Sequence, residues 1–84
     1  MKQLQAYVES RNKWAAIFGN KQYDLKNAAD RQLLAASIDN ELSPENLTCD
    51  GELSTAQVRA RYRSLITVAN ELKAFDPSIT FQEI

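Results

Sequence analysis

The chain has 84 residues, 44% of them hydrophobic and 25% charged, and its net charge is −1. This length suits a single domain, and the composition excludes disordered and collagen-like classes, while the near-neutral balance gives no overall attraction to nucleic acid or an anionic membrane. No apolar run reaches the roughly 18 residues of a membrane span, the first residues lack the apolar core of a secretion signal, and the lone Cys49 cannot form an internal disulfide. We therefore expect a cytoplasmic domain without a membrane segment.

The first predicted helix spans residues 2–18. Its apolar side chains recur at helical spacing along one stripe, which consists of Leu4, Tyr7, Val8, Trp14, Ala15 and Phe18. Gly19-Asn20 should end this helix, because both residues tolerate the left-handed backbone conformation. Arg11 lies near the middle of the stripe, where a guanidinium is costly unless it is ion-paired or its head reaches water.

Two interpretations of Arg11 stay open. In one, it is a structural arginine near Trp14, ion-paired or extending to water. In the other, Tyr7, Arg11, Trp14 and Phe18 form a partly exposed surface that binds a protein partner. Tyrosine, tryptophan and arginine are the residue types that dominate interface energetics, which favours testing the second interpretation.

The second predicted helix spans residues 25–42, with Asp24 as its N-cap. Its apolar residues form two stripes on nearly opposite sides: Leu25, Ala29, Leu33 and Ala36 on one, and Leu34, Ile38 and Leu42 on the other. A helix that is apolar on two sides lies between other helices or keeps one side for a partner. We expect it to be the central helix, or else to present one face to another protein, which includes a second copy in a homo-oligomer.

Residues 32–58 contain no basic residue and five acidic ones, which are Asp39, Glu41, Glu45, Asp50 and Glu52. Within this window, Ser43-Pro44-Glu45 can start a single helical turn and Asp50-Gly51 can form a tight turn. The acidic residues form a second candidate surface, which would attract a basic partner. Simple solvation of the loop is the alternative.

The third predicted helix spans residues 55–75 and begins at a capping box, in which Ser54 and Gln57 satisfy each other's backbone amides. One apolar stripe then continues for four turns through Val58, Tyr62, Leu65, Ala69 and Leu72. Asp76-Pro77 should end the helix, and residues 78–84 favour an extended chain that lies across the helices or pairs with a second copy. The predicted fold class is all-α, a three-helix domain with a short extended C-terminal tail.

Catalysis and metal binding find little support in the sequence. Histidine is absent, which removes the commonest general base and the Ser-His and Cys-His nucleophile pairs. One cysteine without histidine cannot supply the four ligands of a structural zinc site, and two glycines make no phosphate-binding loop. We expect no enzyme activity, no cofactor and no metal.

Nucleic-acid binding is the alternative from another class. Arg59, Arg61 and Arg63 lie beside Tyr62, and Lys13, Lys21 and Lys26 could add to them. At 100° per residue, however, Arg59 and Arg63 share an exposed face while Arg61 flanks the core. The preceding connection of about ten residues is also longer than the turn of a helix-turn-helix.

The segment from Ser43 to Glu52, SPENLTCDGE, followed by a helix with scattered arginines, resembles a segment of small uncharacterised proteins of tailed bacteriophages and their bacterial hosts. Those proteins have no assigned activity, so the resemblance implies no site residue. It implies a setting, since many small phage proteins bind and inhibit or redirect one host protein. We therefore expect a protein–protein interaction module that modulates a host protein, with a nucleic-acid-associated regulator or a virion or assembly component as alternatives.

Overall fold

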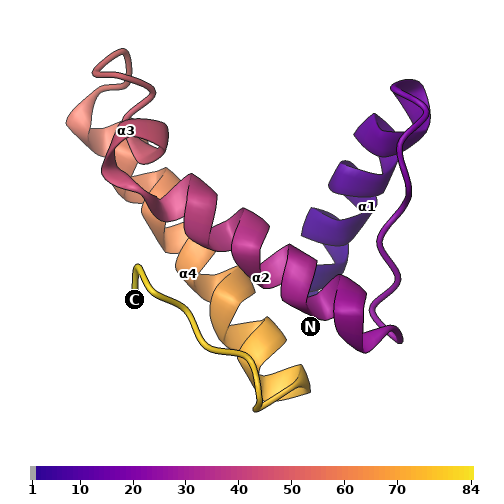
Figure 1. Ribbon diagram of the computed structural model, residues 1–84. Coiled ribbons are helices and arrows are strands. Elements are labelled where there is room, and N and C mark those ends of the chain that lie inside the picture. The colour runs from indigo at the N-terminus through magenta and orange to yellow at the C-terminus, as the bar shows by residue number, and fades with distance from the viewer. Residues whose placement is uncertain (1) are drawn as a thin grey trace.

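The structure, a computed structural model, describes residues 2–84 (Figure 1). It contains four helices: α1 (Lys2–Ile17), α2 (Ala28–Leu42), the single turn α3 (Pro44–Leu47) and α4 (Thr55–Phe75). No strand occurs among these residues, so the predicted all-α, three-helix class is confirmed. None of the helices in the described part of the chain combines the length and apolar character needed to cross a membrane.

The central helix is α4, which contacts α1, α2 and α3. The prediction that residues 25–42 form the central helix is therefore wrong. The stripe of α2 that contains Ala29, Leu33 and Ala36 has no helix packed on it, and Leu33 is 54% exposed. Whether that face binds a partner stays a prediction.

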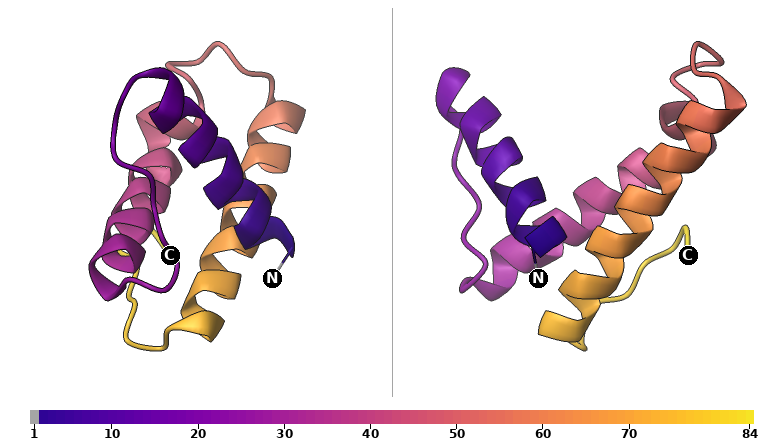
Figure 2. Two further views of the ribbon diagram at one scale, coloured as in Figure 1. Left: turned by 90° about the vertical axis from the view of Figure 1, so that its right-hand side faces the viewer. Right: turned by 180° about the vertical axis from the view of Figure 1, so that it is seen from behind.

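Helices α2 and α4 lie side by side, whereas α1 meets them with its first half and then diverges, so the molecule has the outline of a V (Figures 1 and 2). One arm of the V is the second half of α1 with the segment that follows it. The other arm contains the C-terminal half of α2, α3 and the N-terminal half of α4. This divergence leaves part of α1 without a neighbouring helix.

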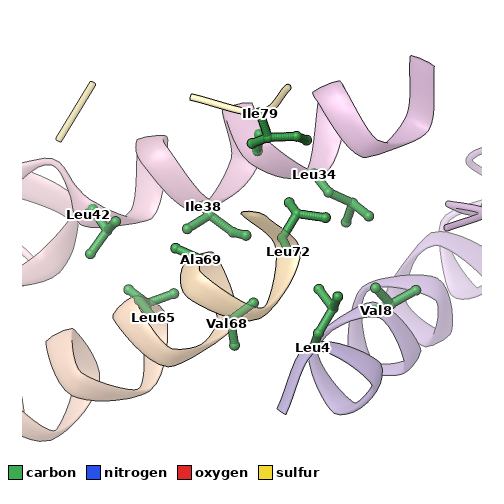
Figure 3. Packing of buried hydrophobic residues seen from close by; sticks show 11 residues of the cluster. Leu4, Val8, Leu34, Ile38, Leu42, Leu65, Val68, Ala69, Leu72 and Ile79 are labelled. Atoms are coloured by element: carbon green, nitrogen blue, oxygen red, sulfur yellow. The ribbon is translucent and has the colours of Figure 1, made fainter. Parts of the chain in front are cut away.

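One hydrophobic core joins the helices (Figure 3). Leu34, Ile38 and Leu42 along α2 face Leu65, Ala69 and Leu72 along α4, as the helical spacing of each set requires. From α1 only Leu4 and Val8 belong to this cluster. The core therefore holds the first half of α1 and not the second.

Helix α1 ends as predicted. The amide of Asn20 donates to Ala15 O at 2.7 Å and that of Gly19 to Ala16 O at 3.3 Å, with Gly19 at a φ of 70°. This is a Schellman arrangement, which needs a left-handed residue at the position of Gly19.

Helix α2 begins three residues later than predicted. Its N-cap is Asn27, whose side chain accepts the amides of Ala29 and Asp30, and the predicted cap at Asp24 is wrong. The Asp24 carboxylate instead accepts the amide of Lys26 and closes a small turn. Both residues are good caps by type, and the path of the connection from α1 selects the second of them.

Two further local predictions hold. The Ser54–Gln57 capping box is present, and the predicted helical turn after Ser43 is α3. The tail forms no strand. It lies against the helices, where Ile79 is fully buried and the amides of Gln82 and Glu83 donate to the Asp39 carboxylate.

Candidate functional site

An open groove of about 600 Å³ lies between the arms of the V, and we call it the α1–α4 groove. It exists because α1 diverges from α4 after its first turns. Its lining comes from three helices: Tyr7, Ser10, Arg11 and Trp14 of α1, Glu41 of α2, and Ala60, Arg61, Ser64 and Leu65 of α4.

A charged cluster crosses this groove from α1 through α2 to α4. Glu41 Oε2 pairs with Arg11 Nη2 at 2.7 Å, and Glu41 Oε1 pairs with Arg61 Nη2 at 3.4 Å. The Tyr7 hydroxyl donates to Glu41 Oε2, accepts from Arg11 Nε at 3.3 Å and lies 2.9 Å from Ser37 Oγ. One carboxylate thus serves two guanidinium groups, so the cluster carries a net charge of +1.

The surroundings hold two members of this cluster, Tyr7 and Arg11, in one charge state. Burial raises the pKa of the Tyr7 phenol, and its hydrogen bond to Glu41 raises the pKa further, so the phenol stays neutral. Burial works to lower the pKa of Arg11, but its hydrogen bonds to Glu41 and Tyr7 outweigh that effect and the pKa is raised. The guanidinium group of Arg11 therefore stays protonated at every physiological pH.

An aromatic pair lies on the diverging half of α1. The rings of Trp14 and Phe18 stack with centroids 5.9 Å apart and an interplanar angle of 15°. These side chains are 56% and 68% exposed, and the neighbouring Ile17 is 61% exposed. Trp14 lines the α1–α4 groove and also a second hollow of about 470 Å³, which Phe18 borders as well. We call Trp14, Ile17 and Phe18 the apolar tip of α1.

The four residues of the first candidate surface therefore lie together. Tyr7 and Arg11 are at the half-buried end, held by Glu41, and Trp14 and Phe18 are at the exposed end. Arg11 is ion-paired, as the structural interpretation expects, and it also lines the groove. Its role in binding stays a prediction.

The five acidic residues of the second candidate surface do not gather in one place. Asp39 holds the C-terminal tail, and Glu41 lies in the groove. Glu45, Asp50 and Glu52 are exposed on the segment that contains α3 and the following turn.

The link between Glu41 and Arg11 was not predicted, although the sequence carries a signal for it. Tyr7 and Arg11 are four residues apart, as are Ser37 and Glu41, so each pair occupies adjacent turns on one helix face. Two polar pairs of this kind, each beside the apolar stripe of its helix, can meet each other when the two stripes pack. Sequence spacing cannot show that they do.

The three arginines of the nucleic-acid alternative are divided. Arg61 faces the groove and Glu41, whereas Arg59 and Arg63 are exposed. Arg63 borders a shallower hollow together with Gln3, Ala60, Ser64 and Thr67. No continuous patch of three arginines forms on the helix.

Within residues 2–84, no three side chains of histidine, cysteine, aspartate or glutamate gather in a way that could hold a metal ion. Fold and groove together define the class of this protein, a small all-α domain with an open, charged groove and an exposed apolar tip. No known family, curated protein or solved structure matches the chain.

Proposed function

We propose that this chain is a non-enzymatic protein–protein interaction module that binds its partner through the α1–α4 groove and the apolar tip of α1. The exposure of Trp14, Ile17 and Phe18 carries this proposal. Adjacent large hydrophobic side chains on a surface mark interaction sites. Covering the exposed parts of Ile17 and Phe18 would contribute about 1–2 kcal/mol each, and aromatic residues next to an arginine are typical of interface hot spots.

The α1–α4 groove adds polar side chains to the binding surface, which the apolar tip does not have. It offers hydrogen-bonding groups from Arg11, Arg61, Ser10 and Ser64 beside the apolar Trp14 and Leu65. A surface that combines an apolar anchor with polar groups around it fits a protein partner better than a small substrate, which is usually enclosed in a deeper pocket.

We further propose a phage or prophage accessory factor in the bacterial cytoplasm that binds and inhibits, or redirects, one host protein. The resemblance of the Ser43–Glu52 segment to small phage proteins supports this setting. That segment lies on the arm of the V opposite the apolar tip, so it leaves the tip free for a partner. Self-association through the exposed Leu33 face of α2 is compatible with this proposal, and light scattering measures it.

A co-purification experiment tests the proposal. The tagged wild-type chain and a Trp14→Ala/Phe18→Ala variant are used to isolate a partner from host extract, and binding of the identified, purified partner is then measured by titration. Because both side chains are exposed, helicity and the unfolding midpoint should stay close to wild type, while affinity falls at least tenfold.

The matched control is Glu9→Ala/Lys13→Ala, which removes two exposed polar side chains from the same helix. It should bind like wild type. Equal affinity of the aromatic variant and wild type for the purified partner would refute a role for the apolar tip.

A nucleic-acid-associated regulator is the alternative, and the exposure of Arg59 and Arg63 is what favours it. It requires affinity for oligonucleotides that falls steeply with salt and with Arg59→Ala/Arg63→Ala. A virion or assembly component, the other alternative, requires the chain to be abundant in purified particles.

A further inference from the structure

We infer that the partner segment in the α1–α4 groove is acidic and amphipathic, with a carboxylate directed at Arg61 and Arg11 and apolar side chains on Trp14 and its neighbours. This inference rests on the groove being the docking surface proposed above. It adds the chemistry of the occupant, which the groove's own charges and hydrogen bonds define.

The charge balance of the groove is the first observation. Its lining contains two guanidinium groups and one carboxylate. Both oxygens of Glu41 are already engaged, Oε1 by Arg61 and Oε2 by Arg11 and Tyr7. The surplus positive charge has no second carboxylate in the lining, and a carboxylate from a partner would complete the balance.

The poor hydrogen bonding of Arg61 is the second observation. Its contact with Glu41 is 3.4 Å long, and its Nε is buried without a hydrogen-bond acceptor. Arg31 shows what a fully engaged arginine looks like in this fold, since its Nε donates to Asp76 and its Nη1 to Leu25 O, both at 2.7 Å. Of the two arginines in the groove, Arg61 gains more from an added acceptor, because Arg11 already pairs with Glu41 at 2.7 Å.

The geometry of Arg61 sets how such an acceptor binds. A partner carboxylate accepts from the Nη groups at the groove, and a change in the side-chain torsions of Arg61 then directs its Nε–H at the second carboxylate oxygen. This gives a bidentate pairing, in which two N–H groups of the planar guanidinium donate to the two carboxylate oxygens. An unpaired buried donor is costly, so the rearrangement is favourable.

The apolar tip of α1 makes the occupant amphipathic rather than simply acidic. A second copy of this chain fits less well. Three of its six exposed acids, Glu45, Asp50 and Glu52, lie in residues 43–54, and that segment contributes none of the exposed large hydrophobic side chains. Glu83 lies in the C-terminal tail, which Asp39 already ties to the helices. Nucleic acid fits less well too, because the Glu41 carboxylate lies between the two arginines.

Selection from a displayed library of random peptides, each about 16 residues and four helical turns long, tests the inference. The purified full chain is the target. The selected peptides should combine aspartate or glutamate with leucine or aromatic residues at helical spacing. Their affinity for the wild-type chain should fall as salt is raised, because added ions screen the pairing of charges.

Two arginine variants form the matched test. Arg61→Gln should weaken binding of the selected peptides by about tenfold to a hundredfold, since it removes a charge-assisted pair. Arg63→Gln removes an exposed arginine of the same helix that does not line the groove, and it should bind like wild type. Circular dichroism establishes that both variants are folded, and the salt dependence of wild type gives a reading that needs no variant.

The outcomes separate the two proposals. Selection of peptides without acidic residues, or equal loss in both arginine variants, overturns the acidic occupant and leaves the docking surface intact. Failure to select any peptide that Trp14→Ala weakens overturns the docking surface itself. Tighter binding of a duplex oligonucleotide than of the selected peptides, lost in Arg61→Gln, overturns the acidic occupant in favour of nucleic acid.

Discussion

At the scale of single residues, buried charge is tolerated where several donors converge on it. Asp30 is only 2% exposed, and its carboxylate accepts the amide of Asp24 at 2.9 Å and the ammonium of Lys21 at 3.2 Å. The Asp24 amide and then Lys21 hold the pKa of Asp30 below its ordinary value, although burial opposes them. Asp76 behaves similarly, since the Ser78 hydroxyl and then Arg31 lower its pKa.

We expect these two carboxylates to contribute to acid unfolding. A lowered folded-state pKa stabilises the protein above the ordinary pKa of about 3.8, and that stability is lost as pH falls through the lowered value. Asp30→Asn should therefore be less stable than wild type at neutral pH, and the difference should shrink below pH 4. Denaturant midpoints measured across pH test this. The exposed Glu52→Gln is the control, and a difference for Asp30→Asn that does not change with pH would contradict the prediction.

Tyr7 gives a prediction at the opposite end of the pH scale. Burial and its bond to Glu41 raise the pKa of this phenol above 10, so its contribution to stability is present below that pH and is lost as pH rises through the raised value. The difference between the ultraviolet titrations of wild type and Tyr7→Phe reports this one phenol. Its midpoint should lie above 10, and a midpoint at or below 10 would show that Tyr7 is not held as described.

At the scale of helices, the sequence predicts where a helix begins and ends better than it predicts which neighbours each helix face contacts. The end signals act over a few residues. The capping box at Ser54 forms as the sequence indicates, because its partners are three residues apart. The start of α2 depends on which of two capable residues the incoming chain favours. Asn12 decides this in part, since its side chain donates to Tyr23 O at 3.0 Å and accepts the Tyr23 amide at 2.6 Å, which ties the connection to α1.

The cap of α2 can be tested by two substitutions. Asn27→Ala should destabilise the protein by about 1 kcal/mol, because two amides of the first turn lose their acceptor. Asp24→Ala should cost less, since its side chain serves one amide outside the helix. Chemical denaturation of both variants measures the difference, and a larger loss for Asp24→Ala would place the cap where the sequence first predicted it.

At the scale of the whole molecule, long-range contacts position the tail and open the groove. The tail crosses the α2–α4 pair because Ile79 fills a place in their core and Asp39 holds the amides of Gln82 and Glu83. The second half of α1 has no equivalent support from another helix, since only Leu4 and Val8 of α1 join the core cluster. The groove follows from this uneven packing.

Truncation of Ile79 tests the docking of the tail. Ile79→Ala should lower the free energy of unfolding by about 2–5 kcal/mol, the usual cost of removing a fully buried branched side chain. Ile84→Ala, at a side chain that is 58% exposed, should change it by less than about 0.5 kcal/mol. Similar small losses for both variants would mean that the tail contributes nothing to the core.

The candidate site was partly predictable from the sequence. The spacing of Tyr7, Arg11, Trp14 and Phe18 placed all four on one side of a helix. Glu41 was also singled out, but as part of an acidic loop rather than as the partner of Arg11. Ala60 and Ser64 carried no signal, because small residues on a helix become groove residues only when a neighbouring helix moves away.

Helices, their main ends and the all-α class follow from the sequence alone, because hydrophobic period, caps and turn residues act over a few positions along the chain. The central place of α4, the exposure of Leu33, the binding of the tail by Asp39 and the pairing of Glu41 with Arg11 do not follow from it. Each of these depends on which apolar stripes pack against each other. The sequence does not specify the pairing, because the hydrophobic effect has no direction and any apolar stripe can pack on any other. Only the folded arrangement selects the pairs, and with them the groove in which we place the function.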